Sequence, residues 1–153
     1  MKRLIFVLAA LMAAAGATFA VASSTEQQAH GTLTSQQLAG PACASPVAFC
    51  ITGKLTGVFN GDYVLTVTSL QPSSTPGVFF YNGSVVDETS KGEVRCSDAG
   101  VYSFADPHGP IVDLCTITSG TGDWAGVSGH LRLHGTFTPA GGGSSHYEGL
   151  IAH

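Results

Sequence analysis

The fold of this chain is decided by the stretch Ile117-Thr118-Ser119-Gly120-Thr121-Gly122-Asp123-Trp124-Ala125-Gly126-Val127-Ser128-Gly129, followed by the alternating run His130-Leu131-Arg132-Leu133-His134-Gly135-Thr136-Phe137-Thr138. A strand ends near Thr118, and the four glycines that follow allow turns and close backbone approaches that a Cβ would hinder. Trp124 is the large apolar side chain among them. A second strand, with a period of two residues, begins at about His130. The stretch predicts a corner between two strands, closed by an apolar plug.

From Ile51 onward the chain consists of short runs typical of strands, separated by turn residues. We expect a turn at Asn82-Gly83, or one bent strand through it, and another turn at Asp98-Ala99-Gly100. No helical period of useful length occurs. Eight or nine strands with regularly spaced turns indicate an all-β barrel or sandwich. Strands are expected at 51–60, 63–69, 77–81, 84–89, 91–97, 101–105, 111–118, 130–138 and 145–152.

The corner resembles the signature of the allene oxide cyclase and dirigent group of β-barrels, a Gly-Gly-Thr/Ser-Gly-x-aromatic-x-Gly-x-x-Gly corner before a late strand. The closing Tyr147-Glu148-Gly149-Leu150-Ile151 resembles the end of the last strand in that group, and the resemblance covers residues 100–151. It implies a single antiparallel eight-stranded barrel of the calycin-like, allene oxide cyclase-like type, and a homotrimer. Allene oxide cyclases close a fatty-acid-derived epoxide, and dirigent proteins steer phenoxy radical coupling. Their catalytic residues find no match here, so the resemblance implies the barrel rather than either activity.

Residues 1–22 have the pattern of an export signal. Lys2 and Arg3 precede the apolar run Leu4–Ala17, and Ala20-Val21-Ala22 forms a small-x-small cleavage site. We therefore expect a secreted protein, of bacterial type. Residues 23–42 predict a flexible N-terminal arm, with one short helix at 35–38 as the alternative, and residues 43–153 the barrel domain. No later stretch is long and apolar enough to span a membrane.

The charge of the chain excludes several kinds of partner. The whole sequence has 6 Lys+Arg and 10 Asp+Glu, and removal of Lys2 and Arg3 with the signal leaves 4 against 10, a net charge of −6. Nucleic acids and anionic membrane surfaces both require basic patches. We therefore expect neither as a partner.

The four cysteines, Cys43, Cys50, Cys96 and Cys115, are expected to form disulfides in an exported chain. Three pairings are possible. We favour Cys43–Cys50, which closes a small loop, together with Cys96–Cys115, which joins two strands if these are neighbours. Each disulfide contributes about 2–4 kcal/mol to stability.

Acid–base chemistry in such a barrel needs a carboxyl group inside it, with its pKa shifted by burial. Asp113 shares a strand face with Cys115 and Ile117, and Asp98 shares one with Cys96 and Val94. These two aspartates are the candidate catalytic residues. The alternative interpretation is that they serve turns or point outward.

The aromatic residues are candidates to line a ligand cavity. We expect a small apolar ligand to contact Tyr63, Phe79, Tyr81, Tyr102, Phe104 and Trp124. Three functions stay open: a binding module, a cyclase or isomerase that needs no metal or organic cofactor, and a structural surface protein with a filled barrel. A bound ligand without turnover favours the first, and a buried, titrating aspartate the second.

A metal site is the remaining possibility. His130 and His134 share a face of one strand, and His146 and Glu148 share a face of the next, so their side chains could converge. Arg132 lies between the first two and would repel a cation. The opposite face carries Leu131, Leu133 and Phe137 and must face the core. We therefore expect the histidine face to meet water and to hold no metal.

Overall fold

The structure, a computed structural model, describes residues 25–153. The predicted export signal and its cleavage site lie outside these residues. The elements are β1 (Glu26–Gln37), the 3-10 turn η1 (Gly40–Ala42), β2 (Cys50–Leu55), β3 (Gly61–Pro72), β4 (Val78–Thr89), β5 (Gly92–Ser103), β6 (Pro110–Gly120), η2 (Gly122–Trp124), β7 (Ser128–Thr138) and β8 (Gly142–Ala152). Within the described residues, no helix is long and apolar enough to cross a membrane.

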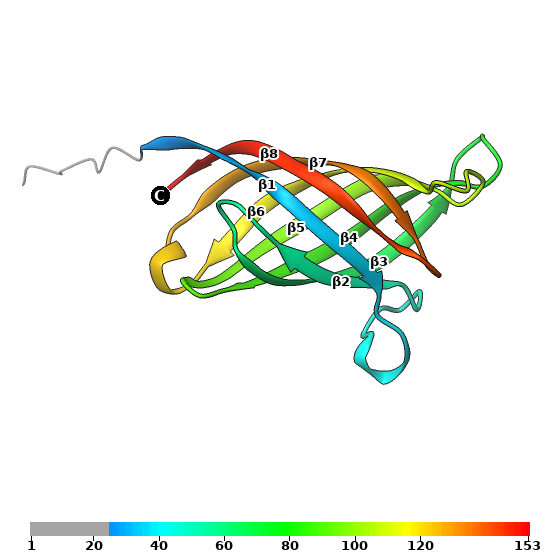
Figure 1. The fold of residues 1–153 in the computed structure, drawn as a ribbon, viewed down its shortest axis with the longest axis horizontal. Coiled ribbons are helices and arrows are strands. Elements are labelled where there is room, and N and C mark those ends of the chain that lie inside the picture. Colours follow the sequence, from blue (N-terminus) through cyan, green and yellow to red (C-terminus); the bar gives the residue numbers. More distant parts are fainter. Residues whose placement is uncertain (1–24) are drawn as a thin grey trace, which may run out of the picture.

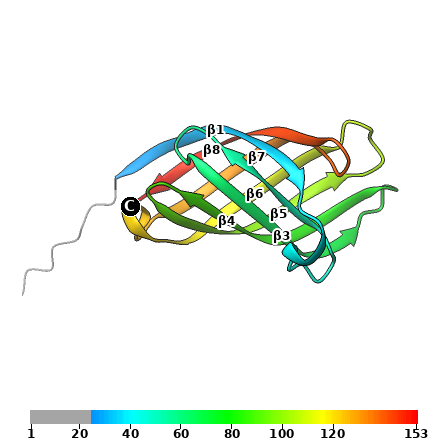
Figure 2. The ribbon, with the colours of Figure 1, turned by 60° about the horizontal axis from the view of Figure 1, so that its bottom comes forward.

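The eight strands form one closed barrel. Each strand pairs antiparallel with the next along the chain, and β8 pairs with β1 to complete the ring (Figures 1 and 2). Closure pairs the strand edges that an open sheet would expose. The predicted all-β, eight-stranded antiparallel barrel is confirmed.

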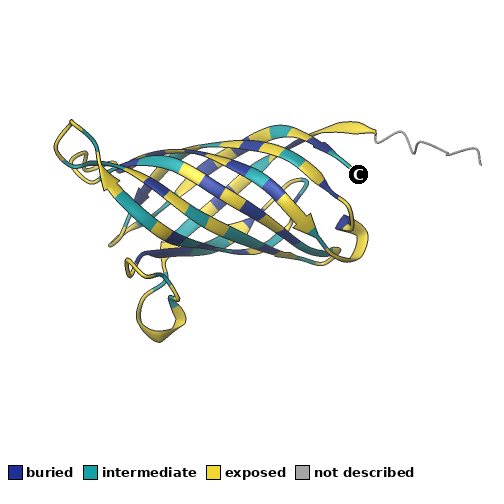
Figure 3. Ribbon diagram, turned by 180° about the vertical axis from the view of Figure 1, so that it is seen from behind, coloured by how far each residue is buried: buried dark blue, intermediate teal, exposed yellow. Residues whose placement is uncertain are grey.

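Residues alternate between the lumen and the exterior along every strand, which Figure 3 shows as a chequered pattern of burial. On β6, for example, Ile111, Asp113 and Cys115 are buried, whereas Val112 and Leu114 are exposed. This period of two places one set of side chains inside the barrel and the other in solvent.

The predicted flexible arm at 23–42 is wrong for most of its length. Residues 26–37 form β1, which lies between β2 and β8 and closes the barrel. The barrel domain therefore begins before Cys43. The strand was hard to recognise because its inward residues are small or polar: besides Leu33 they include Ala29, Gly31 and Ser35. Pairing on both sides, rather than an apolar pattern, holds this segment in place.

One predicted turn is wrong, since Asp98-Ala99-Gly100 lies within β5. Of the two alternatives at Asn82-Gly83, the structure has the single strand, β4, and not the turn. Strands that are paired on both sides override the local turn preference of these residues. A bulge between Val67 and Ser69 of β3 absorbs the irregularity opposite Asn82 and Gly83.

The corner between β6 and β7 has the predicted form. The turn η2 carries Trp124, whose side chain is only 3 % exposed and whose ring lies 5.0 Å from that of Phe59. Its indole Nε1–H donates a hydrogen bond to Thr89 Oγ1 at 3.0 Å. Trp124 thus closes one end of the barrel, and the apolar plug is confirmed.

Both preferred disulfides are present. Cys43 is joined to Cys50, and Cys96 of β5 is joined to Cys115 of the neighbouring β6. All four cysteines are therefore paired. The first disulfide ties the projecting segment between β1 and β2 to the barrel wall, and the second joins two strands.

Candidate functional site

The barrel encloses a cavity to which all eight strands contribute. Its volume is about 50 Å³. Most of the wall is apolar, and the remaining residues include three aspartates. The lining residues are Leu33, Ser35, Ile51, Leu55, Phe59, Tyr63, Leu65, Val85, Asp87, Asp98, Ile111, Asp113, Cys115, Leu131, Leu133, Phe137, Ser145 and Tyr147.

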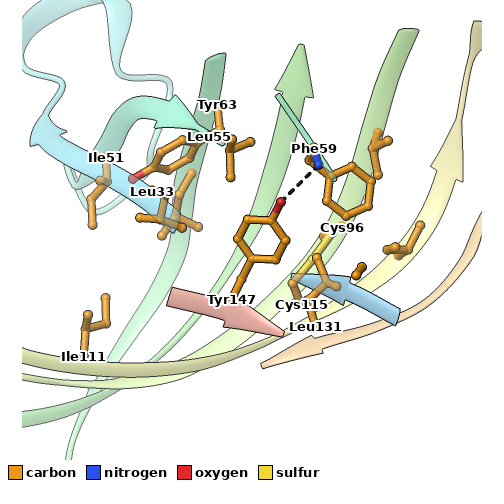
Figure 4. Packing of buried hydrophobic residues seen from close by; sticks show 14 of the residues in the cluster. Leu33, Ile51, Leu55, Phe59, Tyr63, Cys96, Ile111, Cys115, Leu131 and Tyr147 are labelled. Carbon is orange, nitrogen blue, oxygen red and sulfur yellow. Dashed lines mark hydrogen bonds between the residues drawn. A yellow bond between two sulfur atoms is a disulfide. The ribbon is translucent and has the colours of Figure 1, made fainter. Parts of the chain in front are cut away.

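Aromatic side chains close the cavity toward one end of the barrel. Phe59 packs between Trp124 and Tyr147, with ring centroids 5.0 and 5.9 Å apart. The hydroxyl group of Tyr147 accepts a hydrogen bond from the backbone N–H of Phe59 at 3.0 Å, which Figure 4 shows as a dashed line. The same hydroxyl donates to the carbonyl oxygen of Thr56 at 2.8 Å. Tyr147 therefore holds the β2–β3 loop over this end of the cavity.

A second aromatic cluster lies at the other end. Phe49, Tyr102 and Phe137 are buried, and Phe104 packs on Phe49 and Tyr102 with centroid distances of 6.0 and 4.3 Å. The Tyr102 hydroxyl donates a hydrogen bond to the carbonyl oxygen of Phe137 at 2.8 Å. Phe137 also lines the cavity, so this cluster packs against the end of the cavity opposite Trp124.

Three aspartates from adjacent strands enter this apolar space. Asp87 of β4, Asp98 of β5 and Asp113 of β6 are 4 %, 3 % and 9 % exposed. Asp98 pairs with Cys115 and Gly100 pairs with Asp113, so Asp98 and Asp113 are diagonal neighbours on the inner face. Asp87 lies opposite Val94, two inner positions along β5 from Asp98. The structure thus brings the two predicted catalytic candidates together.

Tyr81 orients one of these carboxyl groups. Its hydroxyl donates a hydrogen bond to Asp113 Oδ2 at 2.6 Å, across β5. Gly100 lies between the two residues in the same cross-strand row, and a Cβ there would lie 2.6 Å from Asp113 Cβ and 2.7 Å from Tyr81 Cζ. The tyrosine reaches Asp113 because residue 100 has no side chain.

Burial changes the ionisation of the three carboxyl groups, since the charged form is costly in an apolar interior. It raises the pKa of Asp87 to about 7. Burial, and secondly the charge of Asp113, raise the pKa of Asp98, while the nearby Tyr81 hydroxyl acts in the opposite direction. Burial also raises the pKa of Asp113, although the hydrogen bond from Tyr81 acts in the opposite direction. These groups can therefore exchange protons nearer neutral pH than ordinary aspartates.

The predicted ligand-binding aromatics occupy different places. Tyr63 lines the cavity, where its hydroxyl shares a hydrogen bond of 2.7 Å with Ser35, and burial raises its pKa to about 12. Tyr81 contacts the carboxyl site. The other candidates, Phe79, Tyr102, Phe104 and Trp124, belong to the clusters at the two ends.

Asp87 was missed by the sequence reasoning. It lies at an even spacing from Val85 and Tyr81, so the period of two would have placed it inside had residues 78–89 been read as one strand. A turn at Asn82-Gly83, one of the two predicted alternatives, would have interrupted this period between Tyr81 and Val85.

The histidine candidates lie on the exterior, as the sequence predicts. His134 and His146 are cross-strand partners with ring centroids 5.8 Å apart, and Glu148 lies opposite Arg132. His130 is hydrogen-bonded to Thr116 rather than joining them. Among residues 25–153, no group of three or more His, Cys, Asp or Glu side chains has a metal-binding arrangement.

Comparison with known proteins adds no family assignment. No family model matches the sequence, and no curated protein matches it. Among solved structures, the chain is similar to a pterocarpan synthase dirigent protein, with 11 % identity, a TM-score of 0.39, and coverage of 94 % of this chain and 97 % of that one. A TM-score of 0.39 is too low to transfer any property of that protein to this chain. The function is therefore inferred from the barrel itself.

Proposed function

We propose that this chain is a secreted protein that binds one small, mostly apolar molecule inside its barrel. The observation that supports this proposal is the cavity, which is lined by all eight strands and has aromatic clusters packed toward both ends. Eight-stranded barrels either fill their interior with side chains or hold one small ligand. The cavity favours the second arrangement over a filled, purely structural barrel.

The distribution of polar groups fits a ligand held in one orientation. Apolar residues such as Leu33, Ile51 and Leu131 line much of the wall, whereas Asp98 and Asp113 form a polar site on adjacent strands. Binding cavities typically combine an apolar wall with a few polar groups that orient the ligand. The aspartates of β5 and β6 would serve that purpose here.

Secretion is part of the proposal. The export pattern at residues 1–22 and the two disulfides both suit an oxidising compartment outside the cytoplasm. The homotrimer implied by the family resemblance stays a prediction. The native mass of the purified protein reports the subunit number directly.

Blocking the cavity from inside tests binding. Val85 lines the cavity, whereas the next residue, Val86, has the opposite orientation on β4. We expect wild-type protein to retain a small molecule in native mass spectrometry, or to take up toluene in an NMR titration. Val85→Phe should abolish this uptake, and Val86→Phe, the matched control, should preserve it. A clean mass together with no toluene uptake by the wild-type protein would reject the proposal.

A cyclase or isomerase is the second candidate. A carboxyl group with a raised pKa can donate a proton to a substrate in a dry cavity, and Asp98 and Asp113 have this environment. The test uses the molecule retained by the wild-type protein. If the barrel is an enzyme, that molecule or its precursor is converted, and Asp98→Asn or Asp113→Asn stops conversion while binding persists. Conversion at an unchanged rate in both variants would remove this candidate.

A further inference from the structure

The cavity holds acidic side chains without any basic one. Asp87, Asp98 and Asp113 line it, whereas the four Lys and Arg residues of the described chain (Lys54, Lys91, Arg95 and Arg132) are all exposed on the outside. The six histidines, which all lie within residues 25–153, are exposed as well. Buried carboxylates in proteins are normally paired with a cation or fully hydrogen-bonded. No such cation comes from the described part of this chain.

The fully buried carboxyl oxygens without a hydrogen-bond partner lie on Asp98 and Asp113. Asp98 Oδ1, Asp98 Oδ2 and Asp113 Oδ1 are buried and have no hydrogen-bond partner, whereas Asp113 Oδ2 accepts from Tyr81. Asp98 is 3 % exposed and lines the cavity, so its carboxyl group is available to a molecule inside the barrel. Three acceptor atoms are therefore unpartnered, on two carboxyl groups that are diagonal neighbours.

We propose that the ligand of this barrel is a small apolar primary amine, whose ammonium group lies between Asp98 and Asp113. This inference rests on the proposed binding function and names the chemical class of its ligand. An ammonium group has three N–H donors, which matches the three unpartnered oxygens. Its positive charge replaces the missing counter-charge, and charge-assisted hydrogen bonds are the stronger kind. The apolar wall then accommodates the hydrocarbon part.

The surroundings of the two aspartates determine how binding depends on pH. The titratable groups that face them are Tyr81 and Asp87 from β4, Tyr63 from β3 and Tyr147 from β8. Burial raises the pKa of each tyrosine, so all three stay neutral near pH 7. Because burial also raises the pKa of Asp98 and Asp113, an arriving ammonium displaces a proton from the pair into solvent. Amine affinity should therefore rise with pH.

The experiment uses three probes of similar shape on the purified protein. Benzylamine is cationic, benzyl alcohol is neutral and benzoate is anionic, while all three carry the same ring. Isothermal titration calorimetry is run from pH 5 to pH 8, in buffers of different ionisation enthalpy, so that proton release is measured. At pH 8 we expect benzylamine to bind at least about tenfold more tightly than benzyl alcohol, because its hydrogen bonds are charge-assisted. Its affinity should rise by up to about tenfold per pH unit while one proton is released.

Variants separate the carboxyl site from the rest of the barrel. Asp98→Asn should remove the preference for benzylamine and leave benzyl alcohol binding within about twofold. The matched control is Asp62→Asn on the exposed outer face, where Asp62 pairs with Lys54, and it should leave both affinities unchanged. If Asp98→Asn does not fold, the pH dependence and proton release of the wild-type protein decide the question.

The outcomes distinguish this inference from the proposed function. Benzyl alcohol or benzoate binding as tightly as benzylamine at pH 8, or no proton release with the amine, would overturn the amine inference and leave small-molecule binding intact. Failure of all three probes and of toluene to bind would reject both. Preferential, proton-coupled binding of benzylamine that disappears in Asp98→Asn would support the inference.

Discussion

Replacing Asp87 by Asn tests whether a buried, unpaired carboxyl group reduces the stability of this barrel at neutral pH. Asp87 lines the cavity at 4 % exposure, and burial raises its pKa from the ordinary 3.8 to about 7. The folded protein therefore binds this proton more tightly than the unfolded chain does. Below about pH 4 both states hold the proton, and the carboxyl group imposes no ionisation penalty.

The size of the effect follows from the pKa difference. Between pH 4 and pH 7 the folded state retains a proton that the unfolded state has lost, so the free energy of unfolding falls as pH rises. The slope is at most about 1.4 kcal/mol per pH unit, which gives an upper bound of about 4 kcal/mol at pH 7 and above. For a domain of this size, about 1 kcal/mol corresponds to about 4 °C in Tm.

The assay is urea unfolding of wild-type protein and Asp87→Asn at several values from pH 4 to pH 8. Asparagine introduces a buried amide, whose cost does not depend on pH, so the informative quantity is the change in the stability difference rather than its absolute value. The free energy of unfolding of Asp87→Asn, relative to that of the wild-type protein, should increase by up to about 4 kcal/mol as the pH rises from 4 to 8. Glu88→Gln, at the next and exposed position, should show no such change. A stability difference that is constant from pH 4 to pH 8 would refute the reasoning.

Two further substitutions test the geometry of the carboxyl site. Tyr81→Phe removes the donor to Asp113 Oδ2 and leaves a buried acceptor without a partner. It should therefore reduce the free energy of unfolding at pH 7, measured with urea, by about 1–3 kcal/mol. An unchanged stability would mean that the hydrogen bond is not made. Gly100→Ala places a Cβ 2.6 Å from both Asp113 Cβ and the Val112 carbonyl oxygen, so it should cost about 1–3 kcal/mol and disturb the tyrosine contact. Ala99→Ser, at the exposed neighbouring position, is its control, and equal stability of the two variants would contradict the close approach.

The parts of the fold that the sequence predicts are those with strong local signals. A tryptophan among closely spaced glycines, as at Trp124, strongly favours a corner, and four cysteines that all form disulfides allow only three pairings. The period of two made Asp98 and Asp113 candidates for the interior, because each shares its face with a cysteine and an apolar residue, although it left open that they point outward or serve turns. These predictions depend on the immediate neighbours of each residue.

The missed parts depend on contacts between segments far apart in the sequence. Nothing in residues 26–37 marks a strand strongly, and β1 forms because β2 and β8 pair with it on both sides. The bond from Tyr81 to Asp113 joins residues on β4 and β6, which are separated by a whole strand. The closed barrel determines which donors lie within reach of each carboxyl oxygen. The unpartnered oxygens of Asp98 could therefore not be inferred from composition or spacing.

The open cavity and its carboxyl site have a common structural origin in the pairing of tyrosine with glycine. Tyr81 lies opposite Gly100, and Tyr63 lies opposite Gly53 on the neighbouring strand. A Cβ on either glycine would contact the ring of its partner, at 2.7 Å from Tyr81 Cζ and 3.1 Å from Tyr63 Cε1.

The same arrangement recurs at the β1–β8 junction, where Gly31 lies opposite Tyr147. Each tyrosine ring therefore lies close to the backbone of an adjacent strand instead of extending across the lumen. Each hydroxyl also has a hydrogen-bond partner: Asp113 for Tyr81, Ser35 for Tyr63, and the carbonyl oxygen of Thr56 in the β2–β3 loop for Tyr147. Three large polar side chains are thus satisfied without filling the interior. The three unpartnered oxygens of Asp98 and Asp113 remain, and they are the feature that a ligand would complete.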